Sequence, residues 1–126
     1  MGAPSSAVPK HSPEGCRAQE ILDLVGGKWS LYVIFRLGQG TKRFNELKRE
    51  IDGVSQRMLT VTLRALERDG LVARKVYAVV PPRVEYTLTD MGHTLLDKVA
   101  ALVMWAENHL TEIDAARADY DKRAAT

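Results

Sequence analysis

A short turn in the middle of the chain is the feature that most constrains its fold. Asp52-Gly53-Val54 separates two segments, residues 43–51 and 55–69, in which apolar residues recur at helical spacing. Glycine can adopt the positive φ that a tight turn requires, and Ser55 is of a type favoured at the position just before a helix. The sequence therefore predicts two helices that meet through only three residues.

The second of these segments has two different faces. Leu59, Leu63 and Leu66 recur at i, i+4 and i+7 and are predicted to point into a core. The opposite face carries polar and basic residues: Arg57, Thr60 or Val61, Arg64 and Arg68. Two helices that are joined by a glycine-containing turn, the second basic on its outer face, form the signature of a helix-turn-helix.

Two further helices are predicted before this motif. Residues 17–25 form a short amphipathic segment that ends at Gly26-Gly27. Residues 28–37 are apolar nearly all round, which predicts a helix at the centre of the core.

After Gly70 the pattern changes from helical spacing to alternation. Residues 71–77 and 84–88 are predicted to pair as a β-hairpin whose tip is Val80-Pro81-Pro82-Arg83, with Arg74 and Glu85 forming a cross-strand pair. Thr89 then caps a long helix with an apolar stripe that continues to Ile113. The predicted fold class is mainly α with a small β-hairpin (α+β): a winged helix-turn-helix with an N-terminal helix and a long C-terminal dimerisation helix.

Length and composition allow one domain. The chain has 126 residues and a mass of 14.0 kDa, with 45% hydrophobic and 27% charged residues, which suits a single globular core. We expect residues 1–15, rich in proline and serine, to form a flexible arm, residues 16–115 to form the folded domain, and residues 116–126 to form a charged tail.

The charge is concentrated in the centre of the chain. Residues 28–85 contain 12 Lys and Arg against 6 Asp and Glu, although the whole chain has a formal net charge of only +2. A basic centre between acidic ends suits a protein that docks an anionic polymer on one face. Chance clustering on a solvated face would give the same count, so the charge alone does not decide between them.

Placed on the predicted motif, several residues are candidates for contacts with double-stranded DNA. The N-terminal part of the second motif helix enters the major groove in such modules. Gln56 can pair with adenine and Arg57 with guanine, while Val61 and the Thr60 methyl suit a thymine methyl. The candidates for base contacts are Ser55, Gln56, Arg57, Thr60 and Val61, and those for phosphate contacts are Arg43, Lys48 and Arg64. Arg83, at the predicted tip, is a candidate for a phosphate or minor-groove contact.

Several ordered motifs give the chain a resemblance to a known family. They are Cys16, Gly26-Gly27-Lys28-Trp29, Arg43-Phe44-Asn45-Glu46-Leu47, Ser55-Gln56-Arg57-Met58-Leu59, Gly70-Leu71-Val72 and Pro81-Pro82-Arg83-Val84-Glu85-Tyr86-Thr87-Leu88-Thr89. With these motifs the chain resembles the HxlR-type transcriptional regulators of bacteria and archaea, from Cys16 to about Leu110. The resemblance implies a homodimeric winged-helix DNA-binding regulator, either a repressor or an activator.

The apolar stripe of the last helix independently favours self-association. A domain of this size buries only one face of such a helix, so the stripe is expected to meet a second copy. The predicted interface residues of this helix are Leu95, Val99, Leu102, Val103, Ala106 and Leu110. The resemblance adds the first helix, with Ile21 and Leu22, to that interface. Symmetric pairing predicts a roughly palindromic operator.

Cys16 is the only cysteine, which excludes an intrachain disulfide. Some members of the resembled family sense oxidants or electrophiles through a cysteine at this place, and Arg17 together with a helix N-terminus would favour its thiolate. In that family proline commonly follows this cysteine, whereas Arg17 stands here. A partly buried thiol without a role is the alternative reading.

Other classes of function find little support in the sequence. His11, His93 and His109 are scattered, with no paired carboxylates or nucleophile motif, so we expect no enzyme, no cofactor and no metal. No apolar run is long enough for a membrane span, and we expect a soluble, cytoplasmic protein. The remaining rival is a winged helix that binds another protein without specific DNA binding.

Overall fold

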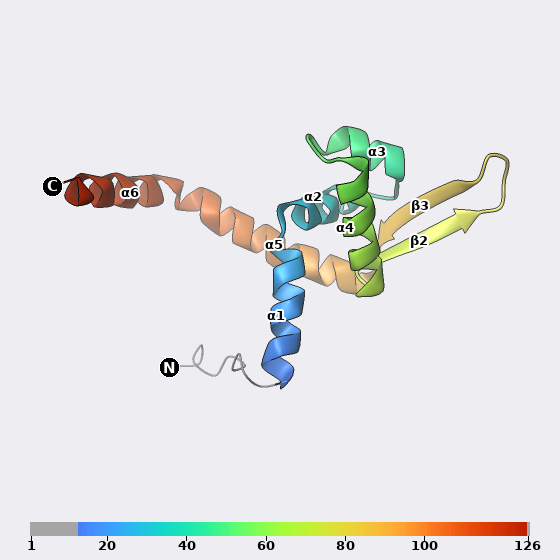
Figure 1. The fold of residues 1–126 in the computed structure, drawn as a ribbon, viewed down its shortest axis with the longest axis horizontal. Coiled ribbons are helices and arrows are strands. Elements are labelled where there is room, and N and C mark those ends of the chain that lie inside the picture. The colour runs from blue at the N-terminus through green and yellow to red at the C-terminus, as the bar shows by residue number, and fades with distance from the viewer. Residues whose placement is uncertain (1–12, 126) are drawn as a thin grey trace. The chain divides into compact units, whose positions relative to one another are not determined.

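The computed structural model describes residues 13–125, and these confirm the predicted fold class. The elements in chain order are α1 (Pro13–Val25), α2 (Lys28–Leu37), β1 (Lys42–Arg43), α3 (Phe44–Glu50), α4 (Gln56–Arg68), β2 (Val72–Tyr77), β3 (Arg83–Leu88), α5 (Asp90–Asn108) and α6 (Leu110–Ala124) (Figure 1). The described chain divides into two compact units, one ending at His93 and the other beginning at Thr94.

Helix α2 is the centre of the core of the first unit, as its apolar composition predicts. Val33 and Ile34 are fully buried, and α2 contacts α1, α3, α4 and β3. The leucines predicted to line the inner face of α4 are also buried, with at most 2% of Leu59, Leu63 and Leu66 exposed. The apolar composition of α2 therefore predicted its central position correctly, and the spacing of the leucines predicted the inner face of α4.

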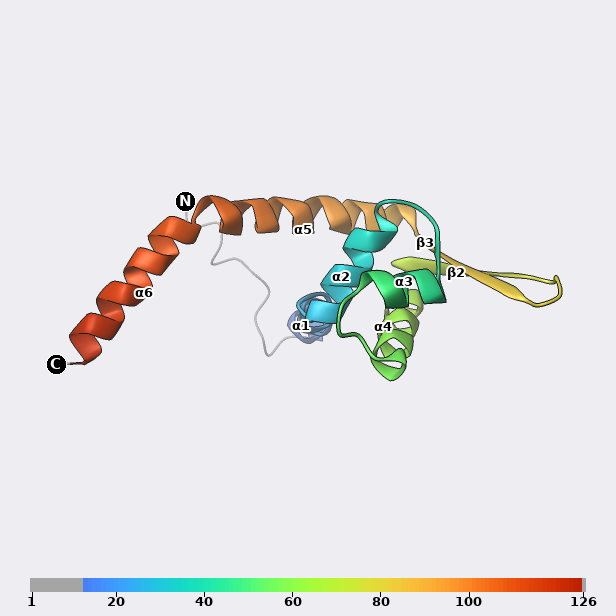
Figure 2. The ribbon, with the colours of Figure 1, turned by 90° about the horizontal axis from the view of Figure 1, so that it is seen from above.

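The sheet has three antiparallel strands in the order β1-β3-β2, one more than the sequence predicts. Strand β1 has only two residues, Lys42 and Arg43, and pairs with β3 so that Arg43 lies opposite Glu85. Two residues are too few to show an alternating pattern, which is why the strand has no signal in the sequence. Figure 2 shows the β2–β3 hairpin extending away from α3 and α4.

The start of α5 is fixed by a cluster of hydrogen bonds around Thr89. Its side-chain oxygen accepts a hydrogen bond from the Gly92 amide at 3.0 Å, as a helix cap does, and donates one to the Gly70 carbonyl at 2.6 Å. The Thr89 amide also donates to the Leu71 carbonyl at 3.1 Å. The predicted capping by Thr89 is thus confirmed, and it ties α5 to the end of α4.

The C-terminal part differs from the sequence prediction in two ways. The sequence predicts one long helix here, but the structure has two, α5 and α6. The backbone departs from helical geometry at His109, whose ring stacks on Trp105 with centroids 4.4 Å apart. Helix α6 then continues to Ala124, where a charged tail was expected after Ala115. Alanine favours helix, and the i,i+4 ion pair between Asp119 and Arg123 supports the added turns.

At the other end, α1 begins at Pro13, inside the predicted arm of residues 1–15. Proline suits the first position of a helix because the amide it lacks has no partner there. The rest of the predicted arm, residues 1–12, lies outside the described residues.

A substitution at Gly92 tests how closely α5 approaches the backbone at Leu71. A Cβ at this position would lie far inside van der Waals contact with the Leu71 carbonyl oxygen. We expect Gly92→Ala to lower the free energy of unfolding by about 1–3 kcal/mol, measured by urea denaturation. Gly27→Ala is the control, since its Cβ would meet the Leu24 carbonyl oxygen at 3.3 Å, and a loss of equal size there would contradict the steric explanation.

Candidate nucleic-acid interface

The start of α4 is built as the sequence predicts. Gly53 has φ +82°, the left-handed conformation that favours glycine, and turns the chain between α3 and α4. Ser55 precedes the helix, and its Oγ accepts a hydrogen bond from the Met58 amide at 3.0 Å. This cap fixes the first turn of α4, from which the predicted base contacts project.

Most of the predicted α4 contact residues are exposed in the protomer. Ser55, Gln56, Arg57, Val61 and Arg64 are exposed, and Thr60 is half-buried. Because Leu59, Leu63 and Leu66 hold the other face in the core, these side chains form one outward surface. We call the exposed set Arg57, Val61, Arg64 and Arg68 the outer face of α4.

Arg43 and Lys48 extend this basic surface onto the neighbouring elements. Both side chains are exposed, Arg43 at the end of β1 and Lys48 on α3. The Arg43 amide donates a hydrogen bond to Glu46 Oε1 at 2.8 Å, which fixes the start of α3. Arg43 also lines a groove of about 910 Å³ between α3 and the hairpin loop.

Arg83 is not at the hairpin tip, contrary to the prediction. It is the first residue of β3, opposite Tyr77, and the loop consists of residues 78–82. Its guanidinium lies 4.4 Å from the centre of the Tyr77 ring, and its Nε is 3.4 Å from Glu85 Oε2. The apolar side chain of Val80, fully exposed, lies in the loop instead.

The predicted pair between Arg74 and Glu85 is wrong. The strand register places Arg74 opposite Tyr86, and it places Lys75 opposite Glu85. Neighbouring residues of a strand point to opposite faces, so the one-residue difference puts Arg74 and Glu85 on different faces of the sheet. Arg74 instead approaches α4, where its Nε lies 3.5 Å from Glu67 Oε1.

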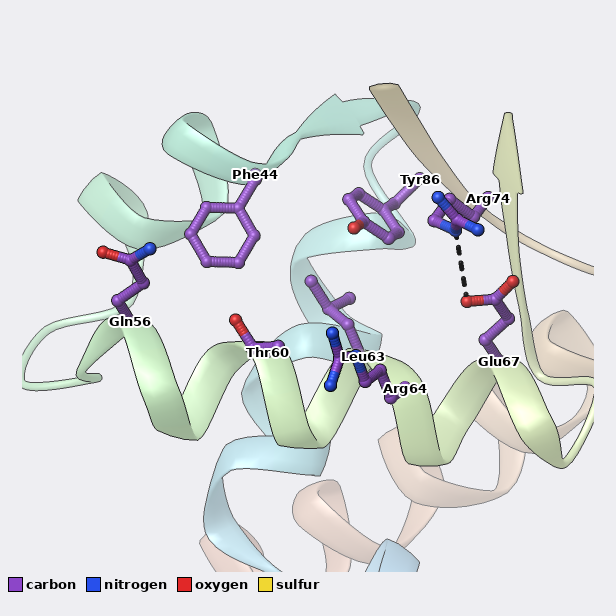
Figure 3. A pocket seen from close by; sticks show the side chains of 8 residues that line it. All are labelled: Phe44, Gln56, Thr60, Leu63, Arg64, Glu67, Arg74 and Tyr86. Carbon is purple, nitrogen blue, oxygen red and sulfur yellow. Dashed lines mark ion pairs between the residues drawn. The ribbon is translucent and has the colours of Figure 1, made fainter. Parts of the chain in front are cut away.

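The sequence did not predict the hollow that this arrangement creates. It has a volume of about 530 Å³ and lies between α4, α3 and the sheet (Figure 3). Its lining residues are Phe44, Gln56, Thr60, Leu63, Arg64, Glu67, Arg74 and Tyr86. Burial raises the pKa of the Tyr86 phenol above its ordinary value, while the Arg74 guanidinium opposes the shift. The alternation of Val84, Tyr86 and Leu88 was the only sequence signal that Tyr86 faces inward.

The predicted dimerisation residues fall into three groups in the protomer. Val99 is buried, and Leu95, Val103 and Ala106 are half-buried. Large exposed fractions remain on the other four: 43% for Ile21, 64% for Leu22, 67% for Leu102 and 53% for Leu110. Met104 and Trp105 on α5 are also more than half exposed and were not among the predicted residues.

Cys16 lies within the bounds of α1, but its side chain is outside the described residues.

Two other kinds of site are absent from the described part of the chain. Within residues 13–125 no helix has both the length and the hydropathy that a bilayer span needs. In the same residues no three His, Cys, Asp or Glu side chains gather closely enough to hold a metal ion.

Comparison with known proteins identifies the family. The model of the HxlR-like helix-turn-helix family matches residues 24–114, which include α2, the α3–α4 motif and the hairpin. The chain belongs to the HxlR-like helix-turn-helix family. The HxlR resemblance inferred from the sequence motifs is therefore confirmed, and the chain is a transcriptional regulator of the helix-turn-helix type.

Relatives in this HxlR-like family match over most of their length. YtfH of Escherichia coli (strain K12), an uncharacterized HTH-type transcriptional regulator, is 46% identical over 112 residues, covering 89% of this chain and 86% of YtfH. YdeP of Bacillus subtilis (strain 168), also an uncharacterized HTH-type transcriptional regulator, is 46% identical over 112 residues, covering 86% of this chain and 88% of YdeP.

Solved structures with the same fold include two regulators in defined redox states. The redox regulator HypR in its oxidized form has a TM-score of 0.67 and 46% identity, covering 74% of this chain and 96% of HypR. The reduced form of the transcriptional regulator YodB from B. subtilis has a TM-score of 0.66 and 33% identity, covering 76% of this chain and 91% of YodB.

Proposed function

We propose that this chain is a sequence-specific double-stranded DNA-binding transcriptional regulator that acts as a homodimer. The observation that carries the proposal is the outer face of α4: a capped helix, held by its leucines, that presents Arg57, Val61 and Arg64 to solvent. A helix of this kind in a helix-turn-helix enters the major groove, where arginine can grip guanine and valine can contact a thymine methyl.

The proposed contacts divide into two classes. Ser55, Gln56, Arg57, Thr60 and Val61 read base edges, and Arg43, Lys48, Arg64 and Arg83 contact the backbone. Arg83 is expected to contribute less than the others because Glu85 lies 3.4 Å from its Nε and competes with a phosphate. The exposed apolar loop residue Val80 gives the hairpin a surface that suits close approach to the minor groove.

Arg57→Ala tests base readout. If Arg57 grips a guanine, its removal costs about 1–3 kcal/mol on the preferred duplex and much less on an unrelated one. Duplexes are first selected from a random pool with the wild-type protein, and affinities are then measured by fluorescence anisotropy. Arg117→Ala, an exposed arginine on α6, is the control for the loss of one positive charge.

Two results would contradict this assignment. An equal loss on preferred and unrelated duplexes would make Arg57 a backbone contact and not a reader of bases. If the wild type enriches no duplex from the pool, the alternative of a winged helix that binds another protein is favoured.

The homodimer proposal is supported by the apolar side chains left exposed on α1 and α5. Large apolar side chains that remain in contact with water favour association with a partner that covers them. We expect Leu102→Glu to convert a species of twice 14.0 kDa into a monomer, as measured by sedimentation over a range of concentrations. Ala115→Glu, an exposed site on α6, adds the same charge and is expected to leave the dimer intact. A wild type that sediments as a monomer would refute the proposal.

A response to oxidants or electrophiles through Cys16 is a further part of the proposal. Its support is that HypR, 46% identical, is a redox regulator and that Cys16 is the one thiol of this chain. With a peroxide, the Cys16 thiolate would attack one oxygen, forming an S–O bond as the O–O bond breaks. Sulfur would lose two electrons to give a sulfenic acid, and with hydrogen peroxide the other oxygen would leave as hydroxide, which takes up one proton to become water.

Cys16→Ser tests this part separately. We expect peroxide to change the affinity of the wild type for its preferred duplex and to leave that of Cys16→Ser unchanged, both measured by anisotropy. The same change in both proteins would exclude the thiol as the sensor. No change in the wild type would exclude a peroxide response and leave DNA binding untouched.

A further inference from the structure

A salt bridge joins α4 to the sheet inside the hollow. Arg74 Nε on β2 lies 3.5 Å from Glu67 Oε1 on α4, and the two side chains are 45% and 38% exposed. Water and ions therefore reach both groups, and a pair this exposed is weak. Another anion that offers better geometry to Arg74 can take the place of the carboxylate.

The surroundings of this pair favour an anion with several oxygens. Arg64 projects from the same helix one turn before Glu67, so the hollow holds two guanidinium groups and one carboxylate. Tyr86 lies opposite Arg74 in the strand register and brings a phenol to the same space, as Figure 3 shows. A guanidinium can donate two parallel hydrogen bonds to a phosphate, which makes arginine pairs a common phosphate site.

Arg64 connects the hollow to the proposed DNA-binding surface. It lines the hollow and also belongs to the outer face of α4. When a helix lies in the major groove, the sugar-phosphate strands run along both of its sides. One of these strands would then pass the side of α4 that faces the sheet, which is the side that lines the hollow.

We propose that the hollow binds one phosphodiester group of the DNA backbone through Arg64 and Arg74, and that Glu67 holds Arg74 in the DNA-free protein and releases it to the phosphate. This rests on the proposed function, since it names a contact of the same interface. Glu67 must yield because its carboxylate repels the phosphate and pairs with Arg74. Glu67 thus lowers the affinity for DNA of any sequence. It also keeps the Arg74 side chain in the hollow, where the phosphate replaces the carboxylate as its partner.

The central test is Glu67→Gln, which removes the competing charge and keeps the size of the side chain. We expect the affinity to rise by about two- to fivefold for each protomer at low salt, equally on preferred and unrelated duplexes. The plot of log affinity against log KCl concentration is expected to steepen by up to about 0.9, because in the wild type the freed Glu67 carboxylate attracts a cation that offsets one released from the DNA, and glutamine attracts none. Both quantities are measured by anisotropy over a KCl series.

Arg74 variants show whether the gain passes through that residue. We expect Arg74→Ala to weaken binding on both duplexes and to flatten the salt dependence, and Arg74→Lys to keep the salt dependence while losing part of the affinity. In the Arg74→Ala background, the gain from Glu67→Gln is expected to shrink, because only the repulsion between Glu67 and the phosphate is then removed, and the difference between the two gains is the coupling that a double-mutant cycle measures. Glu107→Gln on α5 is the control for the change in net charge.

Several results would overturn the proposal. A gain from Glu67→Gln that is undiminished in the Arg74→Ala background, or an equal gain from Glu107→Gln, would show a general charge effect. Unchanged affinity and salt dependence in both Glu67→Gln and Arg74→Ala, with wild-type thermal unfolding, would show that no phosphate enters the hollow. A wild type that binds no duplex would refute the proposed function itself. If the wild type binds and these variants have the same affinity and salt dependence as the wild type, the phosphate site alone is refuted.

Discussion

The packing of α4 against α2 determines which side chains of the chain are available to a partner. Ile34 of α2 and Leu59 of α4 are fully buried, and Leu63 is nearly so. Each such side chain stabilises the fold by about 1.5–3 kcal/mol when it leaves water, whereas an exposed arginine gains little from any one orientation. Rotation of α4 about its axis would expose the leucines, so the leucines and not the arginines fix the direction in which Arg57 and Arg64 point.

The cations of the candidate interface differ in how firmly they are held. Lys42 pairs with Glu50 at 3.1 Å, Arg74 with Glu67, and Arg83 with Glu85. In the described part of the chain, Arg57, Arg64 and Lys48 have no such carboxylate partner. The three paired cations all lie on strands of the sheet, and the others lie on the exposed faces of α3 and α4. A restrained cation loses less side-chain entropy when it binds an anion, but its own carboxylate must first be displaced.

The sequence predicts those parts of the structure that depend on local periodicity and caps. Ser55 and Thr89 cap helices where expected, and the buried face of α4 follows from the spacing of its leucines. The position of Arg74 could not be predicted in this way, because alternation gives the faces of a strand but not its register with the neighbouring strand. The five-residue loop 78–82 sets that register and places Lys75, not Arg74, opposite Glu85. The hollow around Tyr86 depends on the same register and on β1, which is too short to give a pattern.

In the proposed function, dimerisation matches the symmetry of the operator and also increases the discrimination between DNA sequences. One recognition helix contacts a few base pairs, each worth about 1–3 kcal/mol of discrimination, which is too little to separate one operator from a genome of competing sites. Two helices on one operator add their discrimination, so exposed apolar residues such as Leu102 would contribute to specificity without touching DNA. The same reasoning applies to the pair of Glu67 and Arg74. In the proposed dimer, both protomers would release this pair on one operator, so the factor by which it lowers affinity would enter twice. A weak surface pair would then shift the affinity of the dimer about as much as the loss of a base contact.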